Sequence, residues 1–195
     1  MTKAEKTKQL IIDKAAPIFN SKGIAGTSLS DILEATKLAK GSLYVHFENK
    51  EAISHAVVDH FVAHKTKFLS AAFSVKGNAK KKLFSYLDLV LNPAKPLFEG
   101  GCPFLNLGME ADDMDQVIRA KVKKMLETEQ SFISGTIKQG IENGEFQADW
   151  NAKDFATTTY AMIEGAIMIT RVSSGGKSMK TIAAFLKNEI VRHEI

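Results

Sequence analysis

The chain has 195 residues, of which 45% are hydrophobic and 25% are charged, a composition typical of compact globular proteins and unlike that of disordered or fibrous chains. Its single cysteine, Cys102, excludes a disulfide scaffold and a multi-cysteine zinc module, and its formal net charge of +4 is too small to indicate a partner by itself. No apolar run reaches the roughly 18 residues that cross a bilayer. No hydrophobic segment follows the charged N-terminal residues, so we expect a cytoplasmic protein with no membrane partner.

The first three predicted helices are closely spaced. Apolar residues recur at intervals of three and four throughout the chain, so we predict an all-α protein of about nine helices. The first helix spans about 3–22 and ends at Gly23. Ser28 caps a second helix that ends near Thr36, and residues 40–47 form a third, too short to be stable alone. The predicted inward face of the first helix is Leu10, Ala15, Ile18 and Phe19.

Longer helices follow. One runs from about Lys50 into the low seventies, and Asn78 caps the next, which stops before Pro93. Pro103 opens a short helix, and residues 113–143 form another long one.

The last two predicted helices are distinguished by their apolar character. Asn151 and Asp154 resemble a capping box at the start of a helix over 153–172. Ser178 caps the final helix, which carries an apolar side of Ile182, Phe185, Leu186 and Ile190.

The second and third helices, joined by only three residues, predict a helix-turn-helix, whose second helix enters the major groove of DNA. Leu43 and Phe47 hold that short helix to the core. Four polar residues point away from it: Lys40, Ser42, Tyr44 and His46. The alternative is a small three-helix unit that does not touch DNA, but it leaves this outward polar set unexplained.

Four further residues fit the same hypothesis. Gly41 costs a helix about 1 kcal/mol relative to alanine, a cost that makes sense where DNA approaches closely. Thr27 and Ser28 lie at a helix N-terminus, where hydroxyls and free amides can hold a phosphate. Lys50 opens the long helix and can neutralise another phosphate.

The helix-turn-helix and its flanks carry a distinctive residue pattern: Phe19, Gly23, Thr27, Ile32, Ala35, Gly41, Tyr44, Phe47, Lys50 and Glu51. With this pattern, residues 7–55 resemble the DNA-binding region of the TetR family of bacterial one-component transcriptional regulators. One departure is Leu38-Ala39, where the family more often has Gly-Val or a similar pair. Beyond this region only the helix count and the Gly101–Pro103 turn before a group of acids look similar, so the resemblance implies the fold but not the ligand.

The resemblance implies a DNA-binding helix-turn-helix domain over 1–47 and a larger ligand-binding and dimerisation bundle over 48–195. The implied function is that of a transcriptional repressor, acting as a homodimer, which a small-molecule effector releases from a pseudo-palindromic double-stranded DNA operator. The helix over 153–172 and the final helix are our choice for the dimer face, because they carry excess apolar surface and several small residues: Ala156, Ala161, Gly165 and Ala166.

Two other functional classes compete with this interpretation. An enzyme needs a convergent nucleophile, base or metal set, and the sequence contains no phosphate loop, HExxH or Ser-His-Asp order, so we expect no catalysis and no cofactor. A protein-interaction bundle needs only apolar helix faces and does not account for Lys40, Tyr44 and His46.

The effector is predicted to be a small apolar or aromatic compound held between the helices of the bundle. Part of the aromatic and methionine content is ordinary core, and part lines the cavity. The candidate lining residues are Phe61, Phe68, Tyr86, Phe104, Met109, Phe132, Tyr160 and Met162. Cys102, at the mouth of a predicted helix, is a possible sensor of electrophiles or oxidants, although a lone cysteine more often packs as a small buried residue.

Two groups of potential metal ligands in the sequence are better explained without a metal ion. His60 and His64 share a helix face, but two ligands do not make a metal site. The acidic residues Glu110, Asp112, Asp113 and Asp115 lie near a helix start, where its dipole stabilises negative charge. We therefore predict no metal site.

Overall fold

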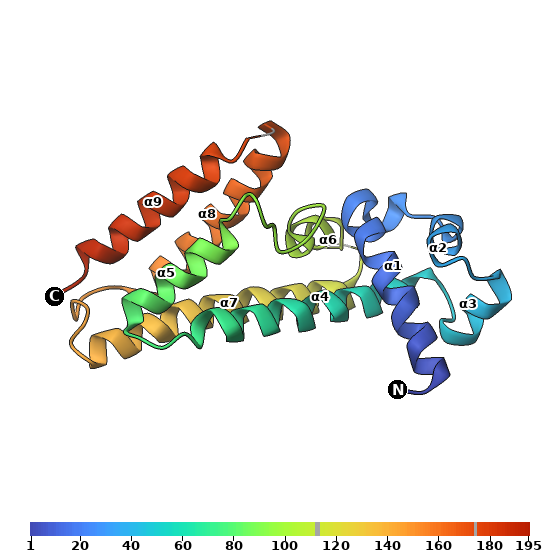
Figure 1. Cartoon of the computed structure of the whole chain (residues 1–195), viewed down its shortest axis with the longest axis horizontal. Coiled ribbons are helices and arrows are strands. Elements are labelled where there is room, and N and C mark those ends of the chain that lie inside the picture. Colours follow the sequence, from blue (N-terminus) through green and yellow to red (C-terminus); the bar gives the residue numbers. More distant parts are fainter. Residues whose placement is uncertain (112–113, 174) are drawn as a thin grey trace. The chain divides into compact units, whose positions relative to one another are not determined.

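The computed structural model describes residues 1–111, 114–173 and 175–195, and within these ranges the fold is all-α, as predicted (Figure 1). An isolated bridge between Phe146 and Glu194 is the β pairing found among the described residues. No described helix has the length and apolar character needed to span a membrane. The helices are α1 (Lys3–Gly26), α2 (Leu29–Thr36), α3 (Lys40–His46), α4 (Lys50–Phe73), α5 (Ala79–Val90), α6 (Pro103–Ala111), α7 (Gln116–Glu142), α8 (Ala152–Ser173) and α9 (Lys177–Arg192).

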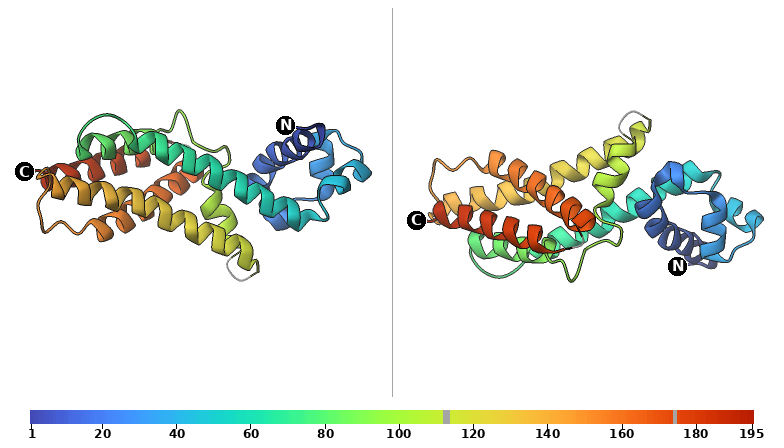
Figure 2. Two further views of the ribbon diagram at one scale, coloured as in Figure 1. Left: turned by 90° about the horizontal axis from the view of Figure 1, so that it is seen from below. Right: turned by 90° about the horizontal axis from the view of Figure 1, so that it is seen from above.

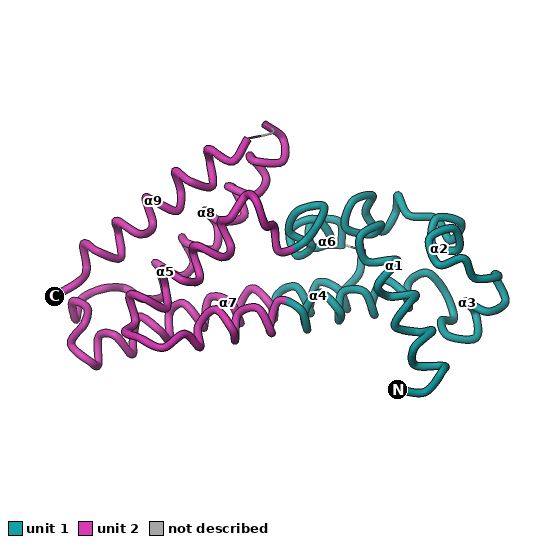
Figure 3. The backbone as a smooth tube through the Cα atoms, in the orientation of Figure 1, with its two compact units in different colours: residues 1–64, 98–123 teal, residues 65–97, 124–195 magenta. Residues whose placement is uncertain are grey.

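The chain forms two compact units (Figure 3). Unit 1 contains residues 1–64 and 98–123, and unit 2 contains residues 65–97 and 124–195. Both α4 and α7 begin in unit 1 and end in unit 2. These units are defined by packing, so their boundaries differ from the predicted functional boundary after residue 47. That functional division stays a prediction.

In unit 1, α1 packs against α2, α3 and α6. The prediction that Leu10 faces inward is wrong, since its side chain is 39% exposed. Ala15 and Phe19 are buried as predicted, Ile18 is half-buried, and the remaining buried residues of α1 are Ile11, Ala16 and Asn20. Gly23, with φ 76° and ψ 173°, ends the regular part of α1 as predicted, and one further turn reaches Gly26.

Hydrogen bonds fasten α6 to the end of α1. The Glu110 carboxylate accepts from the backbone amides of Ile24 and Ala25 at 2.6 and 2.5 Å, and a Cβ at Gly23 would lie 2.7 Å from that carboxylate. Asn106 donates to the backbone and side-chain oxygens of Asn20 at 3.1 and 3.0 Å. The positive φ therefore favours glycine at position 23, and a Cβ there would displace the Glu110 carboxylate from its two amides.

Three further acidic residues are grouped with Glu110 in the sequence. One of them, Asp115, has a separate structural role. Asp115 immediately precedes α7, and its Oδ1 atom accepts from the amides of Val117 and Ile118 in the first turn, both at 3.0 Å. Although burial opposes the shift, hydrogen bonds from Ile118 and His55 hold the pKa of Asp115 below its usual value. Asp112 and Asp113 lie outside the described residues.

In unit 2, α9 packs against α8 and α5, and the α8–α9 pair lies side by side in all views (Figures 1 and 2). The predicted caps are present at Asn78, which accepts from the Lys81 amide at 3.0 Å, and at Asn151, which accepts from the Asp154 amide at 3.2 Å. Ser178, however, does not cap α9. The helix starts one residue earlier, and the Ser178 hydroxyl pairs instead with Thr170 of α8 at 2.8 Å.

Candidate nucleic-acid interface

Local hydrogen bonds and backbone geometry define both ends of α2, the first helix of the helix-turn-helix. Ser28 and Asp31 form a complete capping box, in which the Ser28 hydroxyl accepts from the Asp31 amide and the Asp31 carboxylate accepts from the Ser28 amide. After α2, Lys37 adopts the left-handed conformation at φ 57°, which turns the chain toward α3. No sequence signal predicts the left-handed conformation of Lys37, because glycine or asparagine is more common at such a position.

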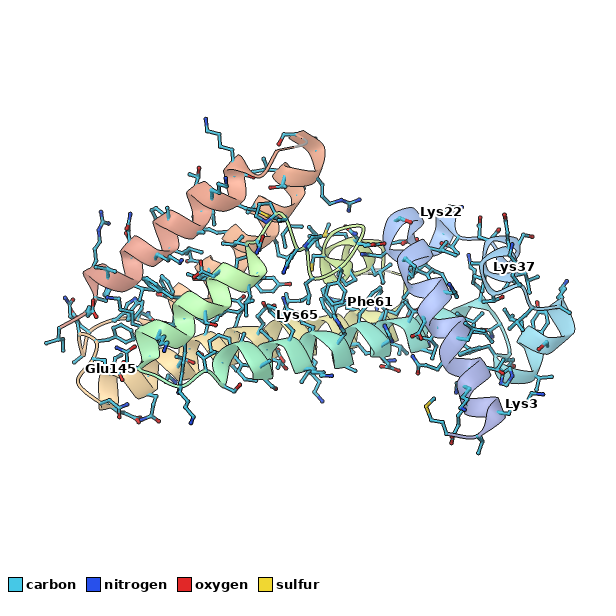
Figure 4. The ribbon with its side chains drawn as sticks, in the orientation of Figure 1. Lys3, Lys22, Lys37, Phe61, Lys65 and Glu145 are labelled. Carbon is cyan, nitrogen blue, oxygen red and sulfur yellow. The ribbon has the colours of Figure 1, made fainter. Side chains whose placement is uncertain are left out.

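Lys22 and Lys37 are labelled on this unit in Figure 4. The Lys22 ammonium lies 2.6 Å from the Asp31 carboxylate, and the hydrogen bond from Lys22, followed by those from Ser28, lowers the pKa of Asp31 well below its ordinary value. Asp31 is therefore ionised at neutral pH, and the capping box keeps its charge near the N-terminus of α2, where the helix dipole stabilises it.

Two apolar anchors orient α3. Leu43 is 1% exposed and Phe47 is 5% exposed, as the sequence predicts. Lys40 and Tyr44 are exposed on the opposite side, with the Lys40 ammonium 6.0 Å from the centre of the Tyr44 ring, while Ser42 and His46 are half-buried. Two of the four predicted outward residues, Lys40 and Tyr44, are therefore accessible, and the other two are accessible in part.

Val45 is the outward residue that sequence reasoning missed. Its side chain is 80% exposed, although valine favours burial and is a poor helix former. A Cβ atom on the neighbouring Gly41 would meet nothing within 4 Å. The protein itself therefore needs neither the exposed valine nor the glycine, and both leave a surface that a partner can approach.

Thr27 and Lys50 have structural partners inside unit 1. The Thr27 side chain is 1% exposed and donates its hydroxyl hydrogen bond to the Gly23 carbonyl at 2.6 Å. The Lys50 ammonium donates to the carbonyls of Ile24 and Thr27 at 2.7 and 2.9 Å. The sequence predicts that Thr27 and Lys50 contact phosphates, and it does not predict these internal hydrogen bonds. Through them the two side chains stabilise the connection between α1 and α2, where Ser28 is exposed.

The predicted effector residues are distributed over both units. In unit 1, Phe61 and Phe104 are buried, and each packs edge-on against Phe98, with ring centres 5.3 and 6.3 Å away. Met109 is 67% exposed, so the expectation that it lines an interior cavity is wrong for this conformation. The Met109 side chain, on the short helix α6, faces solvent instead.

In unit 2, Tyr86 is buried and belongs to an aromatic stack that the sequence did not single out. Phe73 lies between Tyr86 and Phe132, with ring centres 5.0 and 5.4 Å away. Phe68, Tyr160 and Met162, like Phe132, are half-buried. These residues supply the aromatic surface that the effector hypothesis requires.

A buried ion pair adjoins this stack. The Lys65 ammonium (Figure 4) lies 2.8 Å from the Glu129 carboxylate, and the two side chains are 4% and 2% exposed. The Tyr86 hydroxyl donates to the same carboxylate at 2.6 Å. Burial, followed by the charges of Glu129 and Glu164, raises the pKa of Tyr86 well above its usual value, so Tyr86 stays a neutral donor. No periodic pattern indicated this cluster, because its members lie far apart in sequence.

The structure also places Cys102 and the two histidines at positions 60 and 64. Cys102 is 6% exposed and lies directly before α6, where its carbonyl accepts from the Asn106 amide at 3.0 Å. Its role as a sensor stays a prediction. His60 faces the Asp13 carboxylate at 3.6 Å, whereas the ring of His64 packs 5.2 Å from that of Phe98. The two histidines therefore have different partners.

The predicted dimer face needs a correction at two positions. Ala156 and Ala166 are 1% and 0% exposed within a single chain, so they belong to the core of the subunit. Ala161 is exposed, and a Cβ at Gly165 would meet nothing within 4 Å. The large apolar residues exposed on α8 and α9 are Met168, Ile169, Val172, Phe185 and Val191.

Comparisons with known proteins cover both parts of the chain. The sequence profile described as bacterial regulatory proteins of the tetR family matches residues 11–57, and the profile described as a tetracyclin repressor-like C-terminal domain matches residues 79–186. A TetR-family regulator from Cytophaga hutchinsonii superposes with a TM-score of 0.92 at 36% identity, over 100% of this chain and 98% of the other.

Two named relatives are similar over most of their length. The transcriptional repressor DhaR of Mycobacterium sp. is 25% identical over 85% of this chain and 82% of its own. The transcriptional repressor NemR of Escherichia coli is 24% identical over 94% of both chains. These relatives bear the names of helix-turn-helix regulators rather than of enzymes.

Proposed function

The chain belongs to the TetR family of bacterial DNA-binding transcriptional regulators, and we propose that it is a cytoplasmic repressor that a small-molecule effector releases from its operator. The observation that carries the proposal is the arrangement of α3. Leu43 and Phe47 anchor one side of this helix, and Lys40, Tyr44 and Val45 stand exposed on the other. An anchored helix with an accessible polar and apolar face has the geometry that major-groove recognition requires.

The residues of this face have different roles in the proposed complex. Ser28, at the exposed N-terminus of α2, and Lys40, at that of α3, bind phosphates and fix the position of α3 on the duplex. Tyr44, Ser42 and His46 contact bases or phosphates further along the helix. Gly41 allows the backbone to come close to the DNA.

Thr27 and Lys50 contribute to the same complex indirectly, by positioning Ser28. Because Lys50 binds two carbonyls at the connection between α1 and α2, it positions the amides and the hydroxyl of Ser28. An ammonium group has three donors, so the third proton of Lys50 is available to a phosphate while the two carbonyl bonds persist.

A homodimer would present two copies of α3 to a pseudo-palindromic site, with the half-sites separated by about 34 Å or a multiple of it. The exposed apolar residues of α8 and α9 support this assembly, because a symmetric contact between these helices removes them from water. The exposed Ala161 and the open position of Gly165 permit close approach of a second helix.

The effector would bind in the helical bundle, where the stack of Phe73, Tyr86 and Phe132 offers flat aromatic surface and the Lys65–Glu129 pair offers a polar contact. Binding can release DNA only if the effector prefers the conformation that does not bind the operator. The contacts of Glu110 and Asn106 with α1 supply a connection between α6 and the DNA-binding helices that such a change would alter.

The test is DNA binding to the region upstream of the protein's own gene, measured by fluorescence anisotropy at several salt concentrations. Lys40→Ala should weaken binding and reduce the slope of log affinity against log salt by about one. Lys67→Ala, which removes an exposed lysine from α4 in unit 2, is the control and should change neither quantity. A protein-interaction bundle predicts no salt-dependent DNA binding, and this result would reject the repressor.

A further inference from the structure

Three potential metal ligands from two helices meet within unit 1. Glu51 and His55 lie one turn apart at the start of α4, and Asp115 immediately precedes α7. One donor atom from each lies within 4.8 Å of the others. The His55 Nε2 atom is 2.8 Å from Asp115 Oδ2 and 4.0 Å from Glu51 Oε1. We propose that this group binds a divalent transition-metal ion such as Zn²⁺.

The position of Asp115 is fixed independently of any ion. Its Oδ1 atom accepts from the amides of Val117 and Ile118, which leaves Oδ2 directed at His55. Orientation of a ligating carboxylate by a second hydrogen-bonding partner is a regular feature of metal sites in proteins. The carboxylate therefore needs little rearrangement to bind an ion.

The helices that carry the ligands are joined beside the site. The Lys121 ammonium of α7 lies 2.7 Å from the Asp59 carboxylate of α4 and donates to the His55 carbonyl at 3.2 Å. These contacts hold the first turns of α4 beside α7. A preformed site of this kind loses less conformational entropy on binding than one assembled from mobile segments.

The donors and their exposure indicate the class of ion. One imidazole nitrogen and two carboxylate oxygens suit Zn²⁺, Mn²⁺, Fe²⁺, Co²⁺ or Ni²⁺. The side chains of His55 and Asp115 are 22% and 19% exposed, whereas that of Glu51 is 71% exposed. The open side at Glu51 admits the ion and leaves room for water to complete its coordination.

The alternative is a set of ion pairs centred on His55, in which Asp115 lies at 2.8 Å and Glu51 contributes only the longer contact of 4.0 Å. Metal binding uses all three, because the ion replaces the proton between His55 and Asp115 and draws the Glu51 carboxylate inward. Since the ion would join the segment that follows the recognition helix to the start of α7, it should stabilise unit 1 whether or not the protein binds an operator.

The experiment uses the full-length, tag-free protein stripped with EDTA and then dialysed free of it. Isothermal titration with ZnCl₂ should give one site per chain, and Zn²⁺ should raise the melting temperature. His55→Gln and Asp115→Asn should each weaken Zn²⁺ binding by at least roughly tenfold, because loss of even an outer partner commonly costs this much. Glu51→Gln should have a smaller effect.

His60→Gln is the matched control, because it removes a histidine from the same helix outside the proposed site. It should leave Zn²⁺ affinity unchanged. Far-UV circular dichroism and melting in EDTA check that each variant is folded, and Asp115→Asn retains an oxygen that can cap α7. The proposal is overturned if the wild type binds neither Zn²⁺ nor Ni²⁺ nor Mn²⁺, or if His55→Gln binds as tightly as the wild type.

Discussion

The recognition helix α3 and the apolar helix α8 differ in how far their sequences determine which residues face outward. Leu43 in α3 and Phe47 directly after it are buried as predicted. In α8, two of the small residues assigned to an intersubunit contact, Ala156 and Ala166, are buried within the subunit. In a helix of only seven residues, Leu43 together with Phe47 directly after the helix defines one inner face. A helix of 22 residues with apolar residues all round has more than one.

The two regions also differ in the sequence separation of the residues that stabilise them. The cap of α2 and the anchors of α3 involve residues close together in sequence. The contacts inside the bundle join residues such as Lys65 and Glu129, which no periodic pattern connects. We therefore expect substitutions in α3 to affect function more than stability, and substitutions in the bundle to do the reverse.

The largest expected effect is at the buried ion pair of unit 2. Lys65→Met leaves Glu129 charged without its ammonium partner and should lower the free energy of unfolding by about 3–5 kcal/mol. The double variant Lys65→Met/Glu129→Met should recover part of this loss, because apolar residues replace the buried pair at little cost, although the Tyr86 hydroxyl loses its acceptor. Urea denaturation of the three proteins measures both changes. Equal stability of the single variant and the wild type would contradict the importance of distant contacts in the bundle.

The second prediction concerns the outer surface of α9. Phe185→Arg should dissociate the proposed dimer, because a contact that buried the new charge without a partner would cost several kcal/mol. Sedimentation velocity measures the change, and the monomer should stay folded because Phe185 is 47% exposed. Val117→Arg, at an equally exposed residue of unit 1, is the control and should remain dimeric. Dissociation of both variants, or of neither, would place the dimer contact elsewhere.

The third prediction concerns Val45 on α3. Its 80% exposed side chain contributes little to folding, so Val45→Ala should change the free energy of unfolding by less than about 0.5 kcal/mol. If the valine packs against a thymine methyl group in the major groove, operator affinity should fall by up to about tenfold. Anisotropy with operators that replace single thymines by uracil tests this contact. The same loss on every operator variant would indicate a general effect on α3.

The smallest expected effect is at Asp31 on α2. Because Lys22 and Ser28 lower its pKa from the ordinary value of 3.8, Asp31 binds a proton more readily in the unfolded chain than in the folded one. Its stabilising contribution should be fully present above pH 3.8 and decrease as the pH falls below that value. Asp31→Asn should therefore be slightly less stable than the wild type at pH 7, and the difference should shrink in acid. Thermal unfolding across this range provides the measurement.

The candidate sites show where sequence reasoning reached its limit. The spacing of His60 and His64 drew attention to a possible metal pair, but the structure gives these residues different partners. It brings His55, which had no distinctive spacing, beside Asp115. Similarly, Lys50 was expected at a phosphate, whereas its ammonium group binds two carbonyls that precede it by more than twenty residues. Such partners depend on how helices pack, which periodicity does not encode.

The sequence by itself determined the order of the helices, most of their caps, and the anchored recognition helix, because these features depend on residues within a turn or two of one another. The tertiary structure decided which alanines of α8 are core, which side chains surround Glu129, and which acid faces His55. Those outcomes depend on the direction in which one long helix crosses another. Several directions satisfy the same apolar pattern, and side-chain packing in the folded chain selects one of them.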